Sequence, residues 1–170
     1  MESISGDAVF DTNVVLKFFV EEEDTDKAAA LLSRFSSGAP HRMVVPDFLF
    51  AEFINILWLK VRRKELAEQE AGERITQLLL LSAYMDVVPI REVLHRTLEA
   101  SCRLDHAAYD TAFLVIAADR EIPLITADTG LERKSRKYPA EVKLLGEMSF
   151  GGSPETGSNG GASRKNRADS

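Results

Sequence analysis

The sequence has little of what builds disulfide or zinc sites. Cys102 is its single cysteine, which excludes an intramolecular disulfide and is typical of a cytoplasmic protein. His95 and His106 have no second histidine or cysteine at zinc spacing, so we expect both to be surface or capping residues.

Long apolar runs are also missing. No stretch approaches the about 20 apolar residues of a transmembrane helix, and the N-terminus lacks the basic and apolar regions of a signal peptide. We therefore expect a soluble cytoplasmic protein with no membrane partner.

Two further absences bear on function. No glycine-rich phosphate loop is present, which argues against nucleotide binding of the Walker or Rossmann kind. The net charge of -6 argues against a protein that holds nucleic acid by bulk electrostatics. It does not exclude an enzyme with a local basic patch or a bound cation.

Strand and helix patterns alternate along the chain, which predicts an α/β fold with helices on both faces of a central sheet. Short apolar runs predict strands ending near Phe10 and at 43–46, 86–89, 123–126 and 142–145. Amphipathic or apolar spacing predicts helices over 16–20, 25–35, 47–61, 66–83, 91–103, from 107 onward and over 131–138. The class is therefore three-layer α/β/α, with a mostly parallel sheet of four to five strands.

The same spacing predicts which side chains form the core. In the helix over 91–103 we expect Val93, Leu94 and Leu98 to face inward. We also expect Trp58 to belong to the core.

The composition divides the chain into a domain and a tail. At 170 residues one domain is expected, over 1–148. The Gly/Ser-rich segment 149–170 has too few apolar residues for a core and is predicted to be disordered. Its basic run 164–167 is interpreted as part of a solubilising tail rather than a nucleic-acid contact.

Carboxylates recur at strand ends and helix starts. Asp11 and Asp128 follow strands directly, Asp110 lies in the first turn of a helix, and Glu52 interrupts a very apolar helix. Each has a simpler explanation: a helix cap, the helix dipole or an exposed helix edge. For Asp110 the dipole explanation is weaker, because Asp105 is also available to cap that helix.

One fold explains all four acids together, because these positions converge at one edge of a doubly wound sheet. Carboxylates this close repel one another unless a cation compensates. Oxygen ligands without histidine or cysteine favour Mg²⁺, with Mn²⁺ as a substitute, over zinc. The implied chemistry is phosphodiester hydrolysis by a metal-activated water.

Four motifs also carry a resemblance to a known family. They are Val9-Phe10-Asp11-Thr12-Asn13, Val45-Pro46 with Glu52, Tyr109-Asp110-Thr111-Ala112, and Thr126-Ala127-Asp128. In this order and spacing the chain resembles the PIN-domain nucleases over residues 7–148, and most of all the VapC toxins of type II toxin–antitoxin pairs. Thr111 stands where alanine is commoner.

The resemblance implies roles for particular residues. The catalytic, metal-binding acids of the family match Asp11, Glu52, Asp110 and Asp128, and Asn13 and Thr126 match polar positions that orient carboxylates or waters. The implied activity is a Mg²⁺-dependent endoribonuclease acting on structured RNA such as tRNA or rRNA. The implied partners are a VapB-type antitoxin, operator DNA through the antitoxin complex, and a second copy in a homodimer.

Basic residues that are candidates for holding RNA phosphates cluster at two helix ends: Arg62, Arg63, Lys64, Arg133, Lys134, Arg136 and Lys137. Each is equally explained as a solvated helix end.

Three other functions remain open at this point. A stand-alone PIN nuclease would process RNA without an antitoxin. A phosphatase would use Asp11 as its nucleophile, but Asn13 stands where an acid is wanted and no strand-end lysine is evident. A catalytically silent interaction module is disfavoured because all four acids are present.

Overall fold

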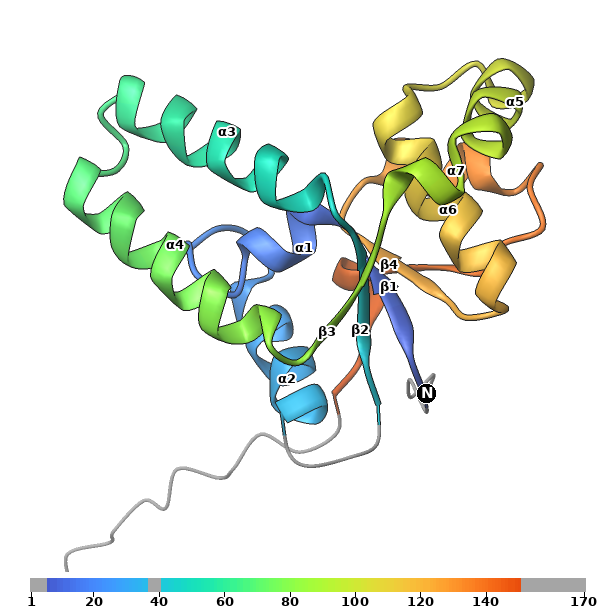
Figure 1. Cartoon of the computed structure of the whole chain (residues 1–170). Coiled ribbons are helices and arrows are strands. Elements are labelled where there is room, and N and C mark those ends of the chain that lie inside the picture. Colours follow the sequence, from blue (N-terminus) through green and yellow to red (C-terminus); the bar gives the residue numbers. More distant parts are fainter. Residues whose placement is uncertain (1–5, 37–40, 151–170) are drawn as a thin grey trace, which may run out of the picture.

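The protein folds around one parallel sheet. The computed structural model describes residues 6–36 and 41–150, and within them five strands run in the order β3-β2-β1-β4-β5 (Figure 1). Their bounds are β1 (Ala8–Phe10), β2 (Met43–Pro46), β3 (Met85–Val88), β4 (Leu124–Thr126) and β5 (Val142–Leu144). Every pairing is parallel, which confirms the predicted α/β class and its edge strand at 142–145.

Helices cover both faces of the sheet (Figure 1). α6 packs across β1, β2 and β4 and carries α5 on its outer side, while α1, α3 and α4 pack on the opposite face. The helices are α1 (Thr12–Leu16), α2 (Thr25–Ser36), α3 (Leu49–Arg62), α4 (Glu68–Ser82), α5 (Leu94–Leu104), α6 (Ala108–Arg120) and α7 (Thr129–Ser135), with short 3-10 turns at η1 (Ile90–Glu92) and η2 (Leu145–Glu147).

The core runs through the central strands and α6. Every residue of β1, β2 and β4 is buried, because both faces of these short strands are covered. α6 is buried continuously from Thr111 to Ala117, so it lies inside the fold rather than on its surface. The first turn of α6 is therefore held by a rigid, fully packed element.

Two predictions about the core are wrong. Leu94 and Leu98 are 54% and 64% exposed, because η1 precedes α5 and the buried face is instead Val93, Thr97, Ala100 and Leu104. Trp58 is 52% exposed, and the Arg62 guanidinium lies 4.7 Å from its ring centroid. The helix α3 buries Leu49, Phe53 and Leu57, which leaves Trp58 on its outer face.

The predicted tail falls, from Gly151 onward, outside the described residues, and so does its basic run 164–167. Among the residues described, no helix is long and apolar enough to cross a bilayer.

Candidate active site

The first acid, Asp11, ends β1 and caps α1. Its carboxylate accepts hydrogen bonds from Thr126 Oγ1 at 2.6 Å and from Asn13 Nδ2 at 2.8 Å. Asn13 Oδ1 in turn accepts from the backbone N–H of Ala127 at 3.0 Å, which joins the end of β1 to the end of β4. Asn13 and Thr126, the two polar positions that the resemblance pointed to, thus both hydrogen-bond to the Asp11 carboxylate.

Burial makes Asp11 hard to ionise. Its side chain is almost fully buried, and this desolvation raises its pKa from 3.8 to about 7, although the Thr126 hydroxyl acts in the opposite direction. The nearby charges of Asp110 and Glu52 raise the pKa further. A cation at this place would favour the ionised form.

Glu52 faces the site from α3 and not the solvent edge of that helix. It is half-buried, and its Oε2 accepts a hydrogen bond from Thr12 Oγ1 at 2.6 Å. Burial raises the pKa of Glu52, with a smaller contribution from Asp110. Thr12 orients Glu52 as Thr126 orients Asp11, a role that the sequence analysis missed.

Asp110 lies in the first turn of α6. The N-cap of α6 is Ala107, which makes no side-chain capping bond, and Asp105 instead ends α5 with φ of 49°. The expectation that Asp105 might cap this helix is therefore wrong. Burial raises the pKa of Asp110, His106 lowers it, and Asp128 raises it again.

Asp128 follows β4 and caps α7. Its Oδ1 accepts from the backbone N–H groups of Gly130 at 2.6 Å and Leu131 at 3.1 Å. A Cβ at position 130 would lie 3.0 Å from this same oxygen, so glycine suits the close approach. The simple capping explanation of Asp128 is correct, and it leaves the second carboxylate oxygen available.

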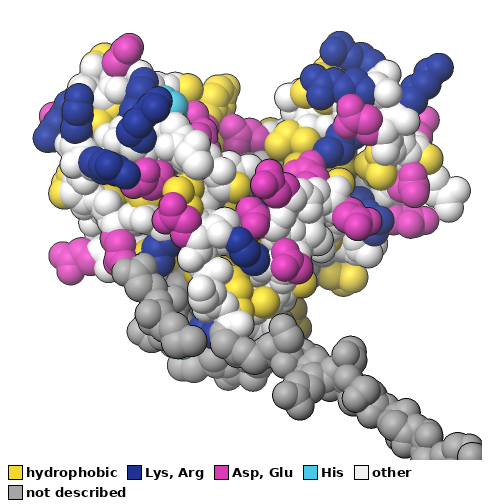
Figure 2. All heavy atoms as spheres, turned by 180° about the vertical axis from the view of Figure 1, so that it is seen from behind, with side chains coloured by type: hydrophobic (Ala, Val, Ile, Leu, Met, Phe, Trp, Pro, Cys, Tyr) yellow, Lys and Arg dark blue, Asp and Glu magenta, His cyan; other side chains and the backbone are white. Residues whose placement is uncertain are grey.

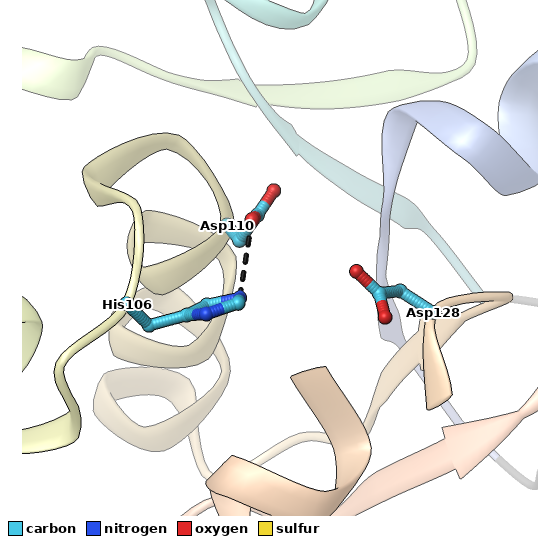
Figure 3. A group of neighbouring side chains, drawn as sticks. All are labelled: His106, Asp110 and Asp128. Atoms are coloured by element: carbon cyan, nitrogen blue, oxygen red, sulfur yellow. Dashed lines mark ion pairs between the residues drawn. The ribbon is translucent and has the colours of Figure 1, made fainter. Parts of the chain in front are cut away.

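His106 joins these acids, although its sequence context pointed to the surface or a cap. Its Nε2 lies 3.1 Å from Asp110 Oδ2, and the ligand atoms of His106, Asp110 and Asp128 all lie within 4.8 Å of one another (Figure 3). Zinc-type spacing does not detect this group. The overlooked signal is that His106 stands four residues before Asp110, one helical turn away.

Asp110 is the centre of the acid group. The charge of Asp110 raises the pKa values of Asp11 and Glu52, and the charge of Asp128 raises the pKa of Asp110. These effects fit the predicted convergence of the four acids. Asp11 and Glu52 nevertheless lie outside the tight group around His106. Carboxyl groups with raised pKa values, next to a buried imidazole nitrogen, suit a divalent cation, because the cation would take the place of the protons on the carboxyl groups.

One face of the molecule has a notch between two lobes (Figure 2). Figure 2 shows acidic side chains along the notch between the two lobes, with lysine and arginine gathered on the outer parts of both lobes. Arg62, Arg63 and Lys64 are exposed at the end of α3.

The predicted basic residues around α7 are Arg133, Lys134, Arg136 and Lys137, and all but Lys134 are exposed. Lys134 donates to the backbone carbonyl of Asp105, and Arg136 pairs with Glu132 at 3.1 Å. Lys134 thus has a structural role in addition to any contact with RNA.

Comparisons of this chain with known proteins point to one family. The model of the PIN domain family matches residues 8–137. Ribonuclease VapC3 of Pyrobaculum aerophilum is 26% identical over 134 residues, covering 79% of this chain and 96% of the relative.

Two solved structures share the fold. One is VapBC2 of Rickettsia felis bound to a DNA fragment from its promoter, with a TM-score of 0.59 and 10% identity over 81% of this chain and 98% of the other. The second is FitAcB of Neisseria gonorrhoeae, with a TM-score of 0.57 and 16% identity over 83% and 99%.

Proposed function

The chain belongs to the PIN domain family, and from this we propose that it is an endoribonuclease that hydrolyses RNA phosphodiester bonds with a divalent cation. The relative named Ribonuclease VapC3, aligned over nearly its whole length, supports this activity. The proposed cations are the two expected for an oxygen-rich donor set, Mg²⁺ and Mn²⁺.

One observation carries the proposal. Asp110 and Asp128 come from different elements, yet their carboxylates meet at the sheet edge beside a buried Asp11 whose pKa is raised to about 7. Such an arrangement costs folding free energy unless a cation binds there, which is the usual sign of a functional site.

The proposed role of each side chain follows from its contacts. Asp110 and Asp128 would hold the cation, and Asp11 and Glu52 would add negative charge to the site. Thr126 and Thr12 keep these two carboxylates oriented through hydrogen bonds of 2.6 Å each. When bound, the cation supplies charge neutralisation and polarises both a water and a phosphate oxygen.

The phosphatase alternative is disfavoured by the position of Asp11. Its side chain is 5% exposed, and one carboxylate oxygen already accepts hydrogen bonds from Thr126 and Asn13. A nucleophile needs an exposed oxygen aimed at the phosphorus, so this buried and tethered group suits charge placement better.

We also propose that the protein is the toxin of a VapBC-type pair. Its structural neighbours include complexes of toxin with antitoxin, one of them on promoter DNA. A VapB-type antitoxin, operator DNA bound through that complex, a homodimer and a tRNA or rRNA substrate are the corresponding proposals for this chain. The domain would comprise residues 1–148, with 149–170 as an appended tail.

Cleavage of total bacterial RNA by the purified chain tests the activity. We expect discrete fragments with Mg²⁺ or Mn²⁺, none with EDTA, and none from Asp11→Asn or Asp110→Asn. Glu73→Gln on the exposed face of α4 is the matched control and should cut like the parent. Absence of metal-dependent cutting by the folded parent would favour the silent interaction module.

Growth arrest tests the toxin assignment separately. Induced expression of the parent chain should stop growth, and Asp110→Asn should not. Cleavage in vitro without any growth arrest would favour the stand-alone RNA-processing nuclease.

A further inference from the structure

His106 is held in place by the backbone around it. It follows Asp105, which ends α5, and its own N–H donates to the carbonyl of Ser101 at 3.2 Å. Lys134 of α7 donates to the Asp105 carbonyl, which ties the loop carrying His106 to the helix that Asp128 caps. The loop that carries His106 and the helix that Asp128 caps are therefore in direct contact, although the two residues are far apart in the sequence.

The Nε2 atom of His106 is the unusual feature. It is buried, and within the described part of the chain it has no hydrogen-bond partner. Its distance of 3.1 Å from Asp110 Oδ2 suits an ion pair, but the ring N–H direction does not meet hydrogen-bond geometry. Nε2 therefore has a carboxylate neighbour but no well-aligned acceptor, and a buried polar atom in this position calls for an explanation.

The distances fit two ligands of one ion. Neighbouring ligands at right angles, each about 2.1 Å from the ion, lie about 3 Å apart, close to the 3.1 Å between His106 and Asp110. Opposite ligands lie about 4.2 Å apart. The whole group lies within 4.8 Å, so small side-chain adjustments would complete the site.

The free oxygen of Asp128 completes the donor set. Its Oδ1 is occupied by the N–H groups of Gly130 and Leu131, and no hydrogen bond reaches Oδ2 from any residue in the described ranges. Figure 3 shows His106 and the carboxylate of Asp128 on either side of the gap below Asp110.

We propose that His106 is a direct nitrogen ligand of the cation held by Asp110 and Asp128, so that this centre prefers Mn²⁺ to Mg²⁺. Mg²⁺ takes oxygen ligands, whereas an imidazole nitrogen suits transition metals and carboxylates suit Mn²⁺ as well. The inference rests on the proposed cation site but not on the RNA-cleaving activity. The competing explanation is that His106 only pairs with Asp110.

Spin-echo spectroscopy of bound Mn²⁺ tests this directly. The full chain, without a polyhistidine tag, is loaded with Mn²⁺ and examined for ¹⁴N modulation from a coordinated imidazole. We expect the modulation in the parent and in the control His95→Gln, which changes an exposed histidine on α5. It should vanish in His106→Gln, while Asp110→Asn should lose the bound Mn²⁺.

Metal affinities give a second readout. In His106→Gln we expect the affinity for Mn²⁺ to fall at least about tenfold and that for Mg²⁺ to change much less. Equal losses for both ions would mean that His106 only positions Asp110 and would overturn the proposal. Absence of ¹⁴N modulation in the parent would overturn it without any variant, whatever the folding of His106→Gln.

The outcomes also separate this inference from the proposed function. A nitrogen signal without RNA cleavage would support the ligand and contradict the nuclease. Cleavage by a protein whose bound Mn²⁺ shows no nitrogen coupling would do the reverse.

Discussion

The helices on the two faces of the sheet hold their functional side chains differently (Figure 1). On one side, α6 is buried from Thr111 to Ala117, and two backbone N–H groups fix Asp128 at the start of α7. On the other side, α3 presents Glu52 through one hydroxyl contact from Thr12 and leaves Trp58 exposed. We call the first the rigid side, because it is more deeply buried, and the second the adaptable side, because a single side-chain hydrogen bond holds Glu52.

This difference indicates where the cation is held. Ligands must be fixed within a fraction of an ångström, which requires firm support from the elements that carry them. Asp110, Asp128 and His106 all belong to the rigid side, whereas Glu52 belongs to the adaptable side. The charges from α3 therefore supplement a centre that the α6 and α7 side already defines.

Aromatic truncations on the two sides should give the largest contrast. Phe113→Ala on α6 removes a side chain that is 1% exposed and should lower the free energy of unfolding by about 3–5 kcal/mol. Trp58→Ala on α3 removes a half-exposed ring and should cost under about 1 kcal/mol. Urea unfolding measures both. Similar losses would show that α3 is as firmly packed as α6.

Asp11, which lies between the two sides, should make the stability of the metal-free protein fall as the pH rises, which is the opposite of the usual effect of a carboxyl group. Its carboxyl ionises near 3.8 when unfolded and near 7 when folded, so between these values the native state keeps a proton that the unfolded state has lost. Stability should therefore fall as pH rises from about 4 to 7, by up to about 4 kcal/mol at 1.36 kcal/mol per pKa unit.

The raised pKa values of Glu52 and Asp110 act in the same direction, so Asp11→Asn should remove part of this fall and not all of it. Urea unfolding with EDTA across this pH range, for the parent and the variant, measures the difference. Added Mn²⁺ should restore stability near pH 7, because a cation favours the ionised carboxylates. Parallel curves for the two proteins would contradict the assignment to Asp11.

Replacing an acid by its neutral isostere should reduce RNA cleavage more on the rigid side than on the adaptable side. Asp128→Asn keeps an oxygen to cap α7, and Glu52→Gln keeps an oxygen for Thr12, so each change removes charge with little loss of structure. We expect RNA cleavage to fall at least about 100-fold in Asp128→Asn and about tenfold in Glu52→Gln. Rate constants at saturating Mn²⁺ measure this, and a larger loss at Glu52 would reverse the comparison.

The strand ends were the easier part of the site to predict from the sequence. Continuous apolar runs that end in Asp11 or Asp128 identify buried parallel strands, and the sheet places their ends at one edge without further information. The order of strands at the sheet edges and the exact phase of each helix depend on packing, which periodicity alone does not reveal.

The errors came from particular local features. Thr97 occupies the buried face of α5 with Val93, Ala100 and Leu104, and a polar residue in that row concealed the correct phase. His106 was judged by zinc-type spacing, although its closest partner is a carboxylate one turn away. The contact between Thr12 and Glu52 spans 40 residues and has no sequence signal.

The contact between Thr12 and Glu52 allows the most specific test of the adaptable side, and it is the test with the smallest expected effect. Thr12→Val keeps the volume of a buried side chain and removes only the hydroxyl that orients Glu52. Cleavage should fall by no more than the about tenfold loss expected for Glu52→Gln, because Thr12 acts only through that carboxylate. Thr12→Ser retains the hydroxyl and should restore most of the rate. If valine and serine reduce cleavage equally, then packing at position 12, rather than the hydrogen bond, supports Glu52, and the adaptable side is held by shape instead of by one polar contact.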